Sequence, residues 1–102
     1  MLIGINHQEL YTFINDISSI TNFAVAIYDT NFNVIQSSKT KLCKFCAEVR
    51  SNPVLDEKCI NCDRFALHEC ARTKKPYVYH CHMNLMEITL PITSNDIIIG
   101  YI

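Results

Sequence analysis

The chain has 102 residues, 49% of them hydrophobic, and a formal net charge of −1 at pH 7. This length allows a real hydrophobic core, so we expect residues 1–102 to form a single domain. Its Lys and Arg residues are dispersed, which excludes the clustered positive charge that nucleic-acid binding requires. No apolar run approaches the roughly 20 residues that span a bilayer, and the N-terminus lacks a signal peptide. We therefore expect a cytoplasmic protein without membrane or nucleic-acid contacts.

The first part of the chain predicts a helix followed by a β-hairpin. Asn6 and Glu9 are typical of a capping box, and apolar residues then recur at helical spacing over 7–20. Two β-rich stretches, 23–29 and 33–38, flank the turn signal DTNFN. The amphipathic helix is also the segment through which we expect a homodimer.

The second part predicts two helices and three strands. A short helical stretch covers 43–51, and Asn52-Pro53 ends it and caps a longer helix that runs to about Thr73. Strands are expected at 77–83, 86–93 and 96–102. The order of elements fits an α+β fold of the PAS or GAF kind, with a five-stranded antiparallel sheet and helices packed on one face.

Two Cys-x-x-Cys pairs dominate the middle of the sequence, at Cys43 and Cys46 and at Cys59 and Cys62. Thiols stay reduced in the cytosol, so these cysteines indicate metal ligands, redox chemistry or core packing before disulfides. The spacing suits a tetrahedral zinc site, although no glycine lies near either pair to form a zinc knuckle. Cys70 is expected to pack in the core.

The helix and the strand that follow add further candidates. On the long helix, Cys59 and Cys62 share an apolar arc, and Asp63 falls toward its middle. A carboxylate there must find a hydrogen-bond donor or a cation, or line a pocket. Side chains alternate between the two faces of a strand, and His80 and His82 need a bulge to reach the face that carries Cys81. Cys81 shares its face with three other residues. These three residues are Tyr77, Tyr79 and Met83.

Enzyme activity is not indicated. A Cys–His nucleophile would need an oxyanion-binding turn, and no glycine-rich turn is present. A thioredoxin-like site would need Cys-x-x-Cys at a strand-to-helix turn in a βαβ unit, and the order of elements does not provide one.

Residues 45–92 resemble the PocR sensory-domain family, a variant of the PAS fold. The matching features are Phe45-Cys46, Arg50-Ser51 with Pro53, Cys59 with Asp63, the strand from Lys75 to Tyr79 with Cys81-His82 and Leu85, and Pro91-Ile92. The chain departs from the family pattern where Met83-Asn84 replaces a usual Ala-Gly, and Cys43 and Cys62 are additions. Residues 7–37 fit the family's opening without distinctive motifs.

The resemblance implies the N-terminal sensory domain of a transcription regulator or signalling protein, whose output domain is not in this chain. Such domains are thought to bind small organic molecules such as diols. We expect the ligand between the long helix and the sheet, at Asp63, Tyr77, Tyr79, His82 and Met83. The recurring cysteines imply a metal or redox role, so an iron–sulfur cluster or zinc is expected at Cys43, Cys46, Cys59, Cys62 and Cys81. The alternative is a structural dimerisation module whose cysteines only pack.

Overall fold

The computed structural model describes residues 6–38 and 44–102. The chain divides into two compact units, one formed by residues 1–41 with 92–102 and the other by residues 42–91. In the described ranges the fold is α+β, with three helices and antiparallel strands, as the sequence predicts.

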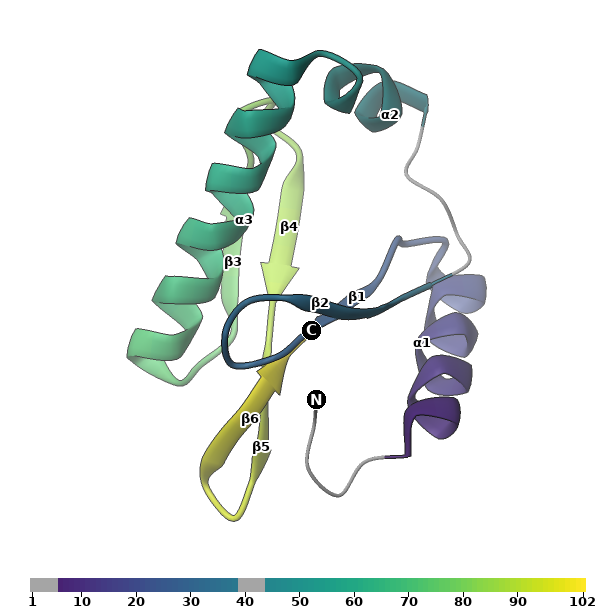
Figure 1. The fold of residues 1–102 in the computed structure, drawn as a ribbon, viewed down its shortest axis with the longest axis vertical. Coiled ribbons are helices and arrows are strands. Elements are labelled where there is room, and N and C mark those ends of the chain that lie inside the picture. The colour runs from purple at the N-terminus through teal and green to yellow at the C-terminus, as the bar shows by residue number, and fades with distance from the viewer. Residues whose placement is uncertain (1–5, 39–43) are drawn as a thin grey trace. The chain divides into compact units, whose positions relative to one another are not determined.

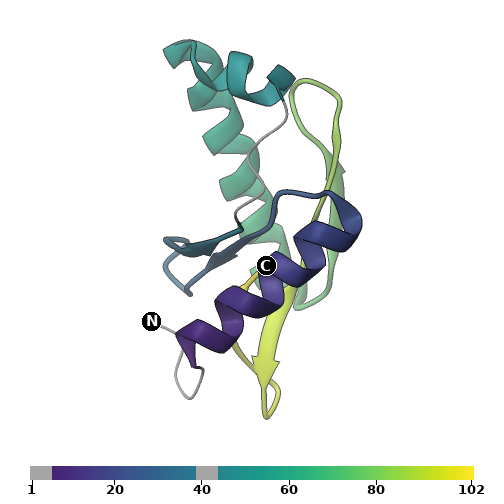
Figure 2. The ribbon, with the colours of Figure 1, turned by 90° about the vertical axis from the view of Figure 1, so that its right-hand side faces the viewer.

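The first unit packs one helix on a four-stranded sheet of order β2-β1-β6-β5. Helix α1 (His7–Thr21) begins after Asn6, whose side chain accepts hydrogen bonds from the backbone N–H groups of Gln8 and Glu9. The strands are β1 (Ala26–Tyr28), β2 (Val34–Ser37), β5 (Pro91–Ser94) and β6 (Ile97–Tyr101). Ile14 of α1 and Ile27 of β1 are fully buried and form the centre of the core. Helix α1 lies against the strands of this sheet (Figures 1 and 2).

The second unit places one long helix along a β-hairpin (Figure 1). It contains α2 (Lys44–Arg50), α3 (Pro53–Thr73), β3 (Tyr77–His80) and β4 (Met86–Thr89). As predicted, Asn52 caps α3, since its side chain accepts from the N–H groups of Val54 and Leu55. Toward its C-terminal end, α3 buries Ala66, Leu67 and Cys70. Cys70 is fully buried, as expected, and its thiol lies 3.8 Å from the Thr89 carbonyl oxygen.

In the part of the chain that the structure describes, the expected strands are not joined in one five-stranded sheet. The described residues form six strands in two sheets, because the strand expected at 86–93 is interrupted at Leu90. Pro91 follows the interruption and has no N–H to donate to a neighbouring strand, so the hydrogen-bond ladder is weakest there. The strand expected at 77–83 also ends early, at His80, because a turn begins at Cys81.

None of the helices in the described part of the chain combines the length and the apolar character that crossing a membrane requires.

Candidate functional site

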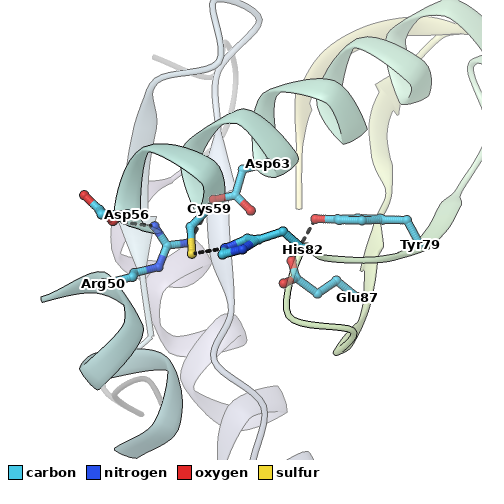
Figure 3. A network of polar contacts seen from close by, with 7 residues as sticks. All are labelled: Arg50, Asp56, Cys59, Asp63, Tyr79, His82 and Glu87. Carbon is cyan, nitrogen blue, oxygen red and sulfur yellow. Dashed lines mark hydrogen bonds and ion pairs between the residues drawn. The ribbon is translucent and has the colours of Figure 1, made fainter. Parts of the chain in front are cut away.

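The candidate site is a group of polar side chains in the second unit, which we call the polar cluster. It is drawn in Figure 3 and consists of Arg50, Asp56, Cys59, Asp63, Tyr79, His82 and Glu87. Helix α3 contributes Asp56, Cys59 and Asp63, whose spacing of three and four residues places them on one side of the helix. The remaining members come from the end of α2, from β3 and β4, and from the turn between them.

Arg50, the last residue of α2, holds the two carboxyl groups of α3. Its Nη1 lies 3.3 Å from Asp56 Oδ1 and its Nη2 lies 3.0 Å from Asp63 Oδ2. The side chains of Arg50 and Asp63 are 31% and 26% exposed, so this pair is only partly screened by water. One guanidinium therefore connects the end of α2 to two carboxyl groups of α3 that lie about two turns apart.

Burial raises the pKa of Asp63 above its ordinary value of 3.8. The hydrogen bond and the positive charge of Arg50 oppose this shift, whereas the negative charges of Glu87 and Asp56 add to it. The ion pair with Arg50 is thus not enough to offset the loss of hydration around this carboxyl group.

The hairpin contributes a second hydrogen-bonded pair. Tyr79 and Glu87 are directly opposite in the β3–β4 register, and the Tyr79 hydroxyl donates to Glu87 Oε2 over 2.8 Å. Burial, and then the adjacent Glu87, raises the pKa of Tyr79 above its usual range. Tyr79 therefore stays protonated at neutral pH and acts as a hydrogen-bond donor.

The turn that joins β3 to β4 carries His82. The N–H of Cys81 donates to the Leu85 carbonyl, and the N–H of Asn84 donates to the Cys81 carbonyl. Asn84 has φ of 64°, so this is a three-residue hairpin loop with a left-handed residue at its end. Asn tolerates this conformation best after Gly, so Asn84 suits the last position of this loop.

His82 reaches α3 from this turn. Its Nε2 lies 3.0 Å from the Cys59 sulfur. Burial raises the pKa of the Cys59 thiol, although the charge of Arg50 opposes the shift. The tautomer of His82 decides which of the two atoms donates in this contact.

Aromatic rings flank the polar cluster on the hairpin side. The ring of Tyr77 stacks on that of Tyr79 with centroids 5.5 Å apart, and Phe65 of α3 meets Tyr77 edge-on at 6.2 Å. Figure 3 shows the His82 ring directed at Cys59 of α3 and the Tyr79 hydroxyl directed at Glu87, while Asp63 extends from the same helix as Cys59. The arrangement combines hydrogen-bond donors and acceptors with aromatic faces.

Comparison with known proteins identifies the family. A family model described as "Sensory domain found in PocR" matches residues 4–102. The chain belongs to the PocR sensory-domain family. It is also similar to the regulatory protein PocR of Salmonella typhimurium, with 22% identity over 99 residues, which is 97% of this chain and 32% of that protein. The chain spans about a third of the length of that relative. No solved structure gives a significant match.

The structure of this PocR sensory domain brings together three of the five residues predicted to bind a ligand, Asp63, Tyr79 and His82. Tyr77 lies behind Tyr79 in the ring stack, and Met83 is a half-buried residue of the turn beside His82. The sequence placed His82 within a strand, from which it would need a bulge to reach the side of Cys81; in the structure it lies on the turn after β3 and reaches Cys59 from there.

Sequence reasoning missed Arg50, Asp56 and Glu87 as members of the polar cluster. A signal for Arg50 was present, because a carboxylate on the apolar arc of α3 requires a cation or a donor. Glu87 could have been found from the hairpin register, which a three-residue loop after Cys81 fixes. Asp56 gave no separate signal, since acidic residues are common in the first turn of any helix.

The predicted metal ligands are only partly brought together. Cys43 lies outside the described residues. Cys46, Cys59, Cys62 and Cys81 are half-buried, and Cys81 is near enough to Cys59 to help raise its pKa. The described residues contain no group of three or more His, Cys, Asp or Glu side chains arranged to hold a metal ion. Their arrangement therefore does not match the four-ligand geometry of zinc.

The raised pKa of Asp63 predicts a specific pH dependence of stability. The folded state holds the Asp63 proton more tightly than the unfolded chain, so the associated stability is fully present below pH 3.8 and is lost as the pH rises through the raised pKa. Asp63→Asn removes the ionisable group, so its stability lacks this pH dependence. The difference in unfolding free energy between the variant and the wild type should therefore shift in favour of the variant as the pH rises through that window. Urea unfolding at several pH values measures this difference.

The exposed Asp16 of α1 provides the matched control, Asp16→Asn. The prediction is wrong if the difference between Asp63→Asn and the wild type does not change with pH, or if Asp16→Asn gives the same profile.

Proposed function

We propose that this PocR sensory domain binds a small organic molecule at the polar cluster and passes its occupancy to an output domain outside this chain. The convergence of Asp63, Tyr79 and His82 from α3 and the hairpin carries the proposal. The proposed role is non-enzymatic. We place the domain in the cytoplasm, where the free thiols of its five described cysteines would persist.

The chemistry of the cluster favours a ligand with at least two hydrogen-bonding groups on a short carbon frame. Asp63 offers a carboxyl group, the Tyr79 hydroxyl offers a donor, and the rings of Tyr77 and Tyr79 offer apolar faces. These groups already hydrogen-bond to protein partners, Asp63 to Arg50 and Tyr79 to Glu87. A ligand must therefore share or replace those partners, which favours groups that both donate and accept, such as hydroxyls.

The placement of the cluster supports a signalling role. Its members come from α2, α3 and both strands of the hairpin. A ligand that contacts all of these elements favours one arrangement of them over another. A ligand shifts a conformational equilibrium only as far as its affinities for the two states differ. Contacts spread over several elements allow such a difference, whereas contacts within one helix do not.

We also propose that the family's PAS-like five-stranded sheet applies to this chain. Strands β4 and β5 are separated by Leu90 alone, so they can serve as two halves of one strand of such a sheet. The antiparallel pairs β1–β2, β1–β6 and β3–β4 support this assignment.

A thermal-shift screen of small alcohols, acids and aromatic compounds tests ligand binding. A ligand at 100 times its Kd stabilises the folded state by about 2.7 kcal/mol, which raises Tm by several degrees in a domain of this size. The variants Asp63→Asn and Tyr79→Phe should lose most of that shift, because each removes one polar contact.

The matched control is His80→Gln, since His80 is exposed on the other face of β3. It should keep the full shift. If no compound raises Tm, and none co-purifies with the chain, ligand binding is excluded and a structural interaction module becomes the better account.

We further propose that the domain forms a homodimer through α1. Phe13 and Ile20 are seven residues apart on one side of α1 and are 56% and 84% exposed. Sedimentation equilibrium should give a dimer for the wild type and a monomer for the double variant Phe13→Glu, Ile20→Glu. The exposed Ser19 gives the control Ser19→Glu, which should stay dimeric. A monomeric wild-type chain contradicts this proposal.

The cysteines support a second candidate function, a redox or metal sensor with zinc or an iron–sulfur cluster. Cys46, Cys59 and Cys81 match cysteines that recur in the family, and Cys59 and Cys81 lie near each other. Metal binding would require these side chains to move closer together than they lie in the structure. Chain purified without oxygen should then contain about one equivalent of zinc, or absorb visible light if it holds a cluster. Folded protein without either contradicts this candidate.

A further inference from the structure

Helix α1 carries a row of exposed side chains in which acidic and apolar residues alternate. Four residues lie along one side of the helix at spacings of four, three and four: Glu9, Phe13, Asp16 and Ile20. We call this set the acidic stripe. The buried residues of α1 lie off this line, and Phe13 and Ile20 leave apolar area in contact with water. The acidic stripe is therefore a surface that a partner can cover.

Helix α3 carries a row with the same alternation and the opposite charge. Five exposed residues lie along one side at spacings of four, three, four and seven: Val54, Lys58, Asn61, Phe65 and Arg72. We call this set the basic stripe. Val54 and Phe65 are 65% and 57% exposed, so this side of α3 also leaves apolar area in contact with water.

The two stripes differ in charge. The described residues of the first unit contain four carboxyl groups and neither Lys nor Arg. On α3, Glu57 and Arg64 border the basic stripe and offset each other, so Lys58 and Arg72 set its charge. Glu69 Oε2 lies 2.6 Å from Arg72 Nη2, but the Arg72 side chain is 69% exposed. The guanidinium of Arg72 can therefore donate to a second carboxylate as well.

We propose that the acidic stripe of α1 docks on the basic stripe of α3 in a second copy of the chain. This inference rests on the homodimer proposed above and names the surface that α1 contacts. If α1 met α1 of the other copy, Glu9 and Asp16 would face two further carboxylates and repel them. Against the basic stripe they meet cations instead, while the apolar residues of both stripes leave water together.

The lengths of the two stripes agree with such a contact. At about 1.5 Å per residue, the acidic stripe extends over about 16 Å and the basic stripe over about 27 Å, so the first fits along the second. If a two-fold axis relates the two copies, the contact occurs twice by symmetry. Exposed ion pairs are weak and are screened by salt, so we expect a reversible dimer that dissociates as the salt concentration rises.

Reversing the charge of each stripe tests this pairing by sedimentation equilibrium of the 102-residue chain. The double variants Glu9→Lys, Asp16→Lys and Lys58→Glu, Arg72→Glu should each raise the dimer Kd at least tenfold, because like charges then face each other. Mixed in equal amounts, the two variants should associate about as tightly as the wild type. In the mixture the basic α1 of one variant meets the acidic α3 of the other, and the unchanged stripes also match.

The matched control is Lys44→Glu, Lys74→Glu, which changes the net charge as much as the α3 variant does. Both residues are exposed and lie outside the basic stripe, so this control should stay dimeric. Recovery of association on mixing also shows that both variants are folded, since an unfolded chain does not regain a binding surface.

The salt dependence of the wild type gives a second measurement that needs no variant. The dimer Kd should rise severalfold between about 50 mM and about 500 mM NaCl, because salt screens the attraction between the stripes. A dimer formed by α1 against α1 should instead tighten, because salt then screens a repulsion.

The outcomes separate this inference from the homodimer proposal. If the α3 variant stays as dimeric as the wild type, or if the control dissociates as much as the α3 variant, the inference is overturned and dimerisation through α1 still stands. Tightening of the wild-type dimer with salt, or a mixture that stays monomeric, overturns it in the same way. A monomeric wild type removes both, and ligand binding at the polar cluster is tested separately by the thermal-shift screen.

Discussion

The polar cluster depends on the ion pairs that Arg50 forms with Asp56 and Asp63. Asp56 and Asp63 lie on one side of α3, and burial removes part of the hydration of the Asp63 carboxyl group. Such a group needs a cation or hydrogen-bond donors, and Arg50 supplies both to the two residues at once. Since α2 ends at Arg50 and Asn52 starts α3 two residues later, the chain brings this guanidinium to the first turns of α3 by its local geometry.

The polar cluster contains three carboxyl groups and one guanidinium group, that of Arg50. Arg50 forms ion pairs with Asp56 and Asp63, and the pKa of Asp63 is raised although Arg50 contacts it. Burial, with a further contribution from nearby negative charges, also raises the pKa of Tyr79 and of the Cys59 thiol, so both groups stay protonated at neutral pH.

Local signals in the sequence predicted most of the elements. Asn6, Asn52 and Pro53 fixed the starts of α1 and α3, and the hairpin over 26–37 followed from its turn residues. The interruption at Leu90 was not predicted, because MEITLPIT reads as one β-rich run and the effect of Pro91 depends on which strand lies beside it. In the site, Asp63 and His82 were found from their types and positions. The contacts of Asp63 with Arg50 and of His82 with Cys59 depend on how separate elements pack, which the periodicity of the sequence does not specify.

Local geometry also explains the sequence departure at the hairpin turn. Asn84 adopts the left-handed conformation that Gly favours, so the loop keeps the backbone that places His82 against Cys59. Met83 changes the side chain beside His82 without requiring a different backbone.

A double-mutant cycle between Arg50 and Asp63 tests the central claim most directly. The unfolding free energies of the wild type, Arg50→Met, Asp63→Asn and the double variant give the coupling between the two side chains. The account predicts a coupling of about 1–2 kcal/mol, because removing either partner leaves the other half-buried and unpaired. A coupling within about 0.3 kcal/mol of zero would contradict it, since Arg50 would then not be what stabilises Asp63 on the inner side of α3.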